Sequence, residues 1–96
     1  MGVRENNVET YFDEQVELIG GITRKWVSPG RDGVTDRIAV IYGTVIFVEV
    51  KPIGGYLEPH QVREHKRLEA AGAIVRTVYG HKQVDVLIEW IVECYC

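Results

Sequence analysis

The stretch DRIAVIYGTVIFVEVK, from Asp36 to Lys51, contains two runs of β-favouring residues separated by a short link. The runs are Asp36–Tyr42 and Val45–Val50. We expect a hairpin with Gly43-Thr44 as its two-residue turn, because glycine at the first central position suits a type II′ turn. The second run is apolar at consecutive positions, which is typical of a strand that is buried on both faces. The sequence therefore predicts a sheet with helices on both sides.

Helical periodicities lie on both sides of this hairpin. Apolar residues recur at every third or fourth position near both ends of the chain, and glycines follow the first two predicted helices. The predicted helices are Glu5–Ile19, His60–Ala71 and Val84–Tyr95, and the predicted strands are Ile22–Val27, Asp36–Tyr42, Val45–Val50 and Ala73–Val78. The fold class is therefore α/β, with a small mixed β-sheet flanked by helices on both faces and the order α-β-β-β-α-β-α.

Size and composition are those of one globular domain, residues 1–96. Hydrophobic residues make up 46% and charged residues 26% of the chain, which excludes a disordered protein. No apolar run approaches the ~20 residues that span a bilayer, and no signal peptide is visible, so we expect a cytoplasmic protein. Cys94 and Cys96 are too close together to close a useful loop, which excludes a disulfide framework and favours a reducing compartment.

The charge is distributed unevenly along the chain. The formal net charge of −3 argues against a generic cationic coat for nucleic acid. The segment 20–67 nevertheless has eight bases and five acids, a net charge of +3, whereas the remainder has a net charge of −6. We expect one face of the molecule to meet an anion while the rest keeps the protein in solution.

The hairpin places three charged side chains on one face at one end. With Gly43-Thr44 as the turn, Asp36 lies opposite Lys51, and Ile38 lies opposite Glu49. Opposed residues share a face, and so do alternate residues on one strand. Asp36, Glu49 and Lys51 therefore project together. Charges on such an apolar face must be paired or hold a metal ion, so the trio is either a salt-bridged cluster at a sheet end or a functional site. The neighbouring loop, rich in glycine, proline and arginine, favours function.

Two carboxylates and an ammonium group suit the hydrolysis of phosphodiesters. Carboxylate oxygens are hard ligands for Mg²⁺ or Mn²⁺, ions that also bind substrate phosphate. A neighbouring lysine can position a metal-activated water and offset the negative charge that builds up in the transition state. The trio therefore indicates a nuclease.

These residues resemble the D…ExK core of the PD-(D/E)xK nuclease superfamily, and their surroundings resemble the VRR-NUC (virus-type replication-repair nuclease) family. The matching segments are Gly20-Gly21, Lys25-Trp-Val-Ser-Pro-Gly-Arg31, Gly33-Val-Thr-Asp36, Phe47-Val-Glu-Val-Lys51 and Leu57-Glu-Pro-His-Gln61. The resemblance covers roughly residues 4–80. The family's usual Gly-Val-Pro-Asp here has threonine in place of proline, which we expect to alter the stiffness of the loop rather than the chemistry.

The resemblance implies a restriction-endonuclease-like core and a role for each matching position. Asp36 and Glu49 would bind Mg²⁺ or Mn²⁺, together with the backbone carbonyl of Val50. Lys51 would be the catalytic lysine of the motif. These four positions form the expected centre of the site.

Two further positions follow from the same resemblance. An acid on the first helix would support the metal ion, and Glu9 matches it, with Glu5 as its competitor. Gln61 would reach the site from the start of the second predicted helix. Its amide could orient a water molecule or a carboxylate ligand.

Basic and polar residues near this site are suited to hold backbone phosphates. They lie around the loop before the hairpin and on the second predicted helix: Lys25, Ser28, Arg31, Arg37, Arg63 and Lys66. His60, His65 and His81 lack the spacing of metal ligands, so we interpret them as surface or rim residues. Trp26 and Trp90 are interpreted as core or interface aromatics.

The leading hypothesis is a metal-dependent DNA endonuclease. Cutting both strands of a branched DNA, such as a Holliday junction or flap, would need two copies of so small a domain, so we expect a homodimer. The preference for branched DNA, and a phage or bacterial setting, are implied by the resemblance alone. The alternatives are a non-catalytic DNA-binding or assembly module that keeps the nuclease fold, and a nickase that is indifferent to DNA structure.

Overall fold

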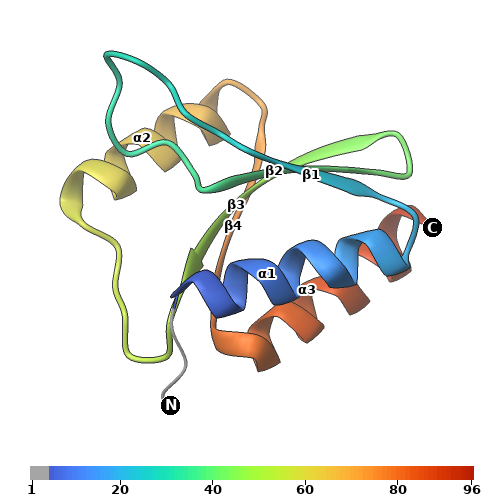
Figure 1. Ribbon diagram of the computed structural model, residues 1–96. Coiled ribbons are helices and arrows are strands. Elements are labelled where there is room, and N and C mark those ends of the chain that lie inside the picture. Colours follow the sequence, from blue (N-terminus) through green and yellow to red (C-terminus); the bar gives the residue numbers. More distant parts are fainter. Residues whose placement is uncertain (1–4) are drawn as a thin grey trace.

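The computed structural model describes the backbone of residues 5–96 and the side chains of residues 7–96. The elements in chain order are α1 (Glu5–Leu18), β1 (Ile22–Lys25), β2 (Arg37–Ile41), β3 (Thr44–Lys51), α2 (Pro59–Ala70), β4 (Ile74–Tyr79) and α3 (Gly80–Tyr95). Figure 1 shows their arrangement, and the predicted order of helices and strands is confirmed. None of the helices in this part of the chain is long and apolar enough to cross a membrane.

The four strands form one mixed sheet in the order β1-β2-β3-β4. β1 pairs with β2, and β2 with β3, in antiparallel fashion, whereas β3 and β4 are parallel. A parallel pair needs a long crossover connection, which α2 and its flanking loops supply. The strand order places β3 inside the sheet, and the chain that follows its C-terminal end leads into α2.

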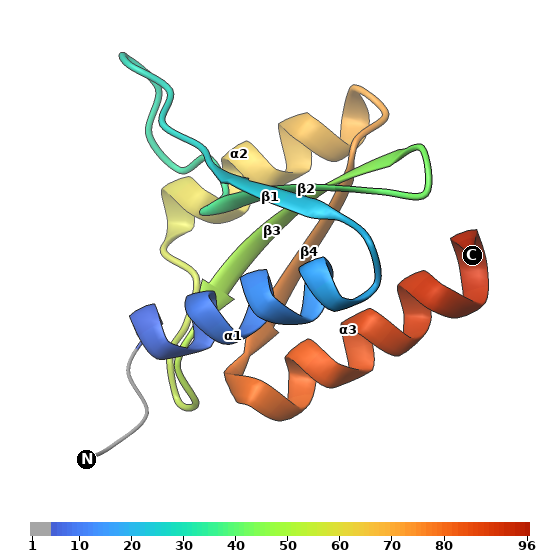
Figure 2. The same ribbon diagram turned by 45° about the vertical axis from the view of Figure 1, so that its right-hand side comes forward.

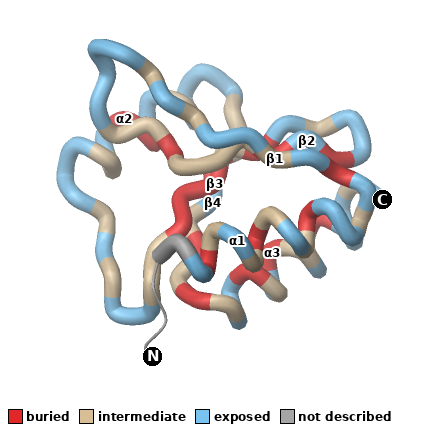
Figure 3. Tube along the Cα trace, viewed as in Figure 1, coloured by how far each residue is buried: buried red, intermediate tan, exposed pale blue. Residues whose placement is uncertain are grey.

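Helices cover both faces of the sheet, as the apolar strands predict. α1 and α3 lie side by side on one face and α2 lies on the other, which Figures 1 and 2 show from two directions. The core fills the space between the sheet and the α1–α3 pair, where the buried chain is drawn red in Figure 3. Its fully buried members come from the sheet and from the two helices on this face: Val8, Phe12 and Val16 of α1, Ala39, Ile41, Ile46, Val48 and Val50 of the sheet, and Val84 and Ile91 of α3.

The turn between β2 and β3 differs from the prediction. Ile41 pairs with Thr44, so the two turn residues are Tyr42 and Gly43 rather than Gly43 and Thr44. Their φ angles of 54° and 73° are both positive, which is the pattern of a type I′ turn rather than type II′. The twist of a type I′ turn matches that of the flanking strands, and Tyr42 accepts a left-handed conformation to achieve it.

This correction shifts the hairpin register by two residues. Ile38 pairs with Phe47 instead of Glu49, and the same alignment carries Asp36 to Glu49 instead of Lys51. Because side chains alternate with a period of two, the shift changes the partners and leaves every side chain on its predicted face.

Candidate active site

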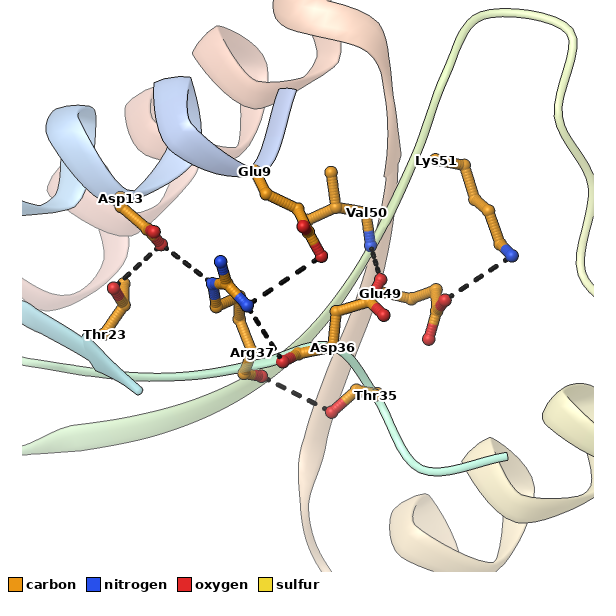
Figure 4. A network of polar contacts seen from close by, with 9 residues as sticks. All are labelled: Glu9, Asp13, Thr23, Thr35, Asp36, Arg37, Glu49, Val50 and Lys51. Atoms are coloured by element: carbon orange, nitrogen blue, oxygen red, sulfur yellow. Dashed lines mark hydrogen bonds and ion pairs between the residues drawn. The ribbon is translucent and has the colours of Figure 1, made fainter. Parts of the chain in front are cut away.

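Asp36 immediately precedes β2, and the backbone fixes it on both sides. Its carbonyl accepts a hydrogen bond from the backbone N–H of Trp26 (3.1 Å), and its Oδ2 accepts one from the backbone N–H of Val50 (2.8 Å). Figure 4 shows the carboxylate held against the end of β3. The preceding residue, Thr35, stands where the family pattern has proline; it is fully buried, and its hydroxyl donates to the Arg37 carbonyl (3.4 Å).

Glu49 of β3 is almost completely buried, with 1% of its surface exposed. Its Oε2 accepts a hydrogen bond from Nε2 of Gln61 (3.2 Å) and lies 3.6 Å from Nζ of Lys51. Its Oε1 lies 3.5 Å from Nε2 of His65. The pKa of the Glu49 carboxyl is raised, chiefly by burial and also by the nearby Asp36. The contacts with His65 and Lys51 lower it in part. The structure thus brings Asp36, Glu49, Lys51 and Gln61 together.

Gln61 connects the start of α2 to this buried carboxylate. Its Oε1 accepts a hydrogen bond from the backbone N–H of Glu58 (2.8 Å), as a residue at this position does in a capping box. With the oxygen of the amide committed to the helix start, the NH₂ group is the end that points to Glu49. Gln61 therefore caps the start of the helix with one end of its amide and orients the Glu49 carboxylate with the other.

His65 does not lie on the surface, and its interpretation as a surface or rim residue is wrong. It is 5% exposed and its ring lies against Glu49. The sequence contains a signal for this contact, because His65 follows Gln61 by four residues and shares its face of the helix. His60 is exposed, and His81 is half-buried with its ring against Tyr11, at a centroid distance of 4.6 Å.

A second polar cluster surrounds Arg37, on the α1 side of the sheet. The Arg37 side chain is only 14% exposed, and its Nε lies 3.1 Å from Oδ1 of Asp13. Its Nη1 lies 3.8 Å from Oε1 of Glu9, and the hydroxyl of Thr23 donates to Asp13 (2.8 Å). Arg37 follows Asp36 directly and its side chain points to the opposite face of the sheet, so the structure does not bring it to the Asp36–Glu49 site.

Glu9 lies where the two clusters approach each other. Figure 4 shows it projecting from α1 toward the strand ends that hold Asp36 and Val50. Its side chain is about four-fifths buried, at 19% exposed, and ion-pairs with Arg37. The competing candidate Glu5 begins α1, but its side chain falls outside the described residues.

The remaining predicted DNA contacts come from β1, the loop before β2 and α2. Four are exposed, namely Lys25, Arg31, Arg63 and Lys66, and Ser28 is half-buried. The loop before β2 packs closely on the start of α2, since a Cβ at Gly33 would lie 2.6 Å from the His60 carbonyl oxygen. Glycine at this position thus allows the loop that carries Arg31 to approach the start of α2.

The two tryptophans take different positions. Trp26 is half-buried beside Phe47, with ring centroids 5.1 Å apart. Trp90 of α3 is also half-buried, and the guanidinium of Arg76 lies 4.5 Å from the centre of its ring. Both are aromatics at the margin of packed layers rather than members of the polar site.

The donor set suits a hard divalent cation. Asp36 and Glu49 supply carboxylate oxygens, the ligands that Mg²⁺ and Mn²⁺ prefer. Among the side chains of residues 7–96, no three His, Cys, Asp or Glu form a preformed metal cage. The protein would therefore supply few ligands and leave the other positions to water and substrate, which is usual for Mg²⁺.

Comparison with known proteins assigns the chain to a family. No family model matches the chain. A curated protein named "Putative nuclease p44", from Acyrthosiphon pisum secondary endosymbiont phage 1, is 49% identical over 71 residues, which are 73% of this chain and 76% of that protein. A solved structure described as "VRR_NUC domain" superposes with a TM-score of 0.79 at 35% identity, and the match covers 96% of this chain and 97% of that one. The chain therefore belongs to the VRR-NUC family of nuclease domains.

Proposed function

We propose that the protein is a metal-dependent endonuclease that hydrolyses phosphodiester bonds of DNA. The observation that carries this proposal is the meeting of Asp36, Glu49 and Lys51 at one end of β2 and β3, beside the loop that carries Arg31 and the helix that carries Arg63 and Lys66. Asp36 and Glu49 would hold Mg²⁺ or Mn²⁺, with Glu9 and the carbonyl of Val50 completing the protein's share of the ligands. A bound ion would act as a Lewis acid on the phosphate and favour ionisation of the attacking water.

The chain's own groups would do the rest of the work. Hydrolysis forms a bond from the water oxygen to phosphorus and breaks the bond to a sugar oxygen, which leaves with a proton as an alcohol. Lys51 carries the positive charge nearest to Glu49, 3.6 Å from its Oε2, and can orient the water and offset negative charge on the phosphate. Gln61 keeps the Glu49 carboxylate in one orientation through its hydrogen bond.

DNA would lie across the loop before β2 and the exposed face of α2. Lys25, Arg31, Arg63 and Lys66 are exposed there and suited to phosphate contacts, with Ser28 as a hydroxyl donor. Such contacts set the register of the backbone without reading its sequence. The substrate would therefore be selected by shape, in keeping with a branched DNA such as a Holliday junction or flap.

A homodimer would place two such sites on one branched substrate. One copy of the chain carries one Asp36–Glu49–Lys51 trio, so paired cuts on opposite strands need a second copy. A two-fold axis would relate the copies and present the sites symmetrically. The relationship to a phage protein supports a phage or bacterial setting for this activity.

The direct test is cleavage of labelled DNA. The protein is incubated with a four-way junction, a flap and a linear duplex, each with Mg²⁺, with Mn²⁺ or with EDTA. Metal-dependent paired cuts on the junction are expected. Equal cutting of all three substrates would remove the branched specificity, and the nickase alternative predicts cuts in one strand only. Tight junction binding without cleavage would replace the enzyme with a non-catalytic DNA-binding module.

A further inference from the structure

His65 occupies a buried position beside the site that the proposed reaction leaves without a role. It lies about one helical turn after Gln61, and both side chains reach Glu49 from α2. Nε2 of His65 and Oε1 of Glu49 are 3.5 Å apart. Both atoms are buried, and neither has a better hydrogen-bond partner within the described part of the chain.

The chemistry of the two groups fixes the direction of this contact. A buried polar atom left unpaired is destabilising, so the two atoms are expected to pair with each other. An ionised carboxylate can only accept hydrogen bonds, so Nε2 of His65 must carry the proton. The two oxygens of Glu49 are then each held by one residue of α2, Oε2 by Gln61 and Oε1 by His65.

We propose that His65 is a positioning residue that holds the Glu49 carboxylate in the orientation required to bind the divalent metal ion. This inference rests on the proposed function, since it assigns Glu49 to the metal. Groups that hydrogen-bond to a metal ligand without touching the metal typically change metal affinity or activity by roughly 10- to 100-fold when removed. His65 lies against the carboxylate and would act through it, so its loss should weaken metal binding more than it slows cleavage at saturating metal.

Three variants separate positioning from simple packing. His65→Leu removes the donor and keeps most of the bulk, so the core stays filled. His65→Gln keeps an N–H at about the position of Nε2 and should restore the contact with Glu49. Glu69→Gln is the matched control, because Glu69 is exposed near the other end of the same helix.

Two measurements follow metal binding and one follows the contact itself. Calorimetric titration with Mn²⁺ gives a Kd without any cleavage, and the cleavage assay gives the Mn²⁺ concentration for half-maximal rate. Both should rise roughly 10- to 100-fold in His65→Leu and return most of the way in His65→Gln. Nitrogen NMR of the wild-type imidazole without metal should show the proton on Nε2 of His65.

The possible results distinguish the role of His65 from the function itself. If wild-type protein binds Mn²⁺ and His65→Leu binds it equally well, the positioning role is overturned while the nuclease proposal stands. A proton on Nδ1 alone, or a His65→Gln variant as weak as His65→Leu, also overturns the role. Wild-type protein that neither binds Mn²⁺ nor cleaves DNA overturns both proposals.

Discussion

Two polar clusters lie at the same end of the sheet on opposite faces, and they are built differently. The Arg37 cluster, formed by Glu9, Asp13, Thr23 and Arg37, pairs one cation with two acids; its hydrogen bonds are 2.8 and 3.1 Å long and its Arg37–Glu9 ion pair is 3.8 Å long. The Glu49 cluster consists of Asp36, Glu49, Lys51, Gln61 and His65. It holds two neighbouring carboxylates, and the side-chain contacts of Glu49 are longer, at 3.2–3.6 Å.

The difference indicates which cluster serves the fold and which serves the chemistry. In the Arg37 cluster, carboxylates of α1 pair with a guanidinium and a hydroxyl of the sheet, so the cluster joins α1 to the sheet. Two carboxylates in a buried setting repel each other and favour a cation between them, and burial together with Asp36 raises the pKa of Glu49. We therefore expect substitutions in the Glu49 cluster to affect catalysis and substitutions of Asp13 and Arg37 to affect stability, whereas Glu9 pairs with Arg37 and is also a proposed metal ligand.

The largest expected effect is the loss of cleavage in Asp36→Asn. Asparagine keeps an oxygen that can accept the hydrogen bond from Val50 and removes the charge, so the fold should be retained. Cleavage of DNA should fall by roughly 10³-fold or more, since charge at the reacting centre is lost. Cleavage rates and thermal melting of the same preparation provide the measurement.

Asp13→Asn in the Arg37 cluster is the matched control for this substitution. It makes the same chemical change in the other cluster, so it should keep its cleavage rate and melt at a lower temperature, because Arg37 and Thr23 lose a charged partner. Full activity in Asp36→Asn, or equal loss of activity in both variants, would contradict the division between the clusters.

Arg37→Ala should have the largest effect on stability. Removing the guanidinium leaves Asp13 and Glu9 without this cation, in surroundings where the Arg37 side chain is 14% exposed. The free energy of unfolding should fall by about 1–3 kcal/mol, which corresponds to a decrease in Tm of roughly 5–20 °C. Chemical denaturation and thermal melting measure the loss.

Arg67→Ala tests whether burial causes that effect. Arg67 and Glu64 form an ion pair of the same length, 3.1 Å, but the Arg67 side chain is 58% exposed. The Glu64 side chain is only 10% exposed, but the guanidinium of Arg67 stays in contact with water, so Arg67→Ala should lower the Tm less than Arg37→Ala does. Equal destabilisation by the two substitutions would show that the Arg37 cluster has no special structural role.

Divalent metal should raise the Tm by binding at the Glu49 cluster, and this rise should not depend on Asp13 of the Arg37 cluster. A ligand at ten times its Kd adds about 1.4 kcal/mol, which raises the Tm of a domain of this size by roughly 6–11 °C. Mn²⁺ should therefore raise the Tm of the wild type and of Asp13→Asn, and should have little effect on Asp36→Asn. A metal-dependent rise that survives in Asp36→Asn would place the ion elsewhere.

The order of elements could be predicted from the sequence because it depends on local patterns. The turn at Tyr42-Gly43 could not, since glycine suits either central position and the choice depends on the pairing of Ile41 with Thr44. The prediction that Asp36 and Glu49 share a face holds despite the wrong turn, because a register shift of two residues leaves the alternation of side chains unchanged.

The positions of Arg37 and His65 differ in how far the sequence reveals them. Alternation already places Arg37 on the face opposite Asp36, so its position could have been predicted from the hairpin. The burial of His65 against Glu49 depends on how α2 lies over the sheet, which is a long-range property of the fold. Its spacing from Gln61 indicates the contact only once Gln61 itself has been placed in the site.

The smallest expected effect concerns Arg31 in the exposed loop before β2. If its guanidinium contacts one DNA phosphate, Arg31→Ala should reduce the slope of log binding constant against log salt by about one unit. The Tm should not change, because Arg31 is exposed. Binding is measured at several salt concentrations in the Asp36→Asn background, so that the DNA stays intact.

Lys82→Ala in α3 is the control for charge alone. Lys82 is also exposed, but it lies outside the basic segment 20–67 and should leave the salt dependence unchanged. The same reasoning applies to Arg37, whose guanidinium is engaged by Asp13 and Glu9. Arg37→Ala should therefore lower the Tm without changing the salt dependence, and Arg31→Ala should do the reverse. An unchanged slope in Arg31→Ala would remove this loop from the DNA interface and leave α2 as its remaining basic surface.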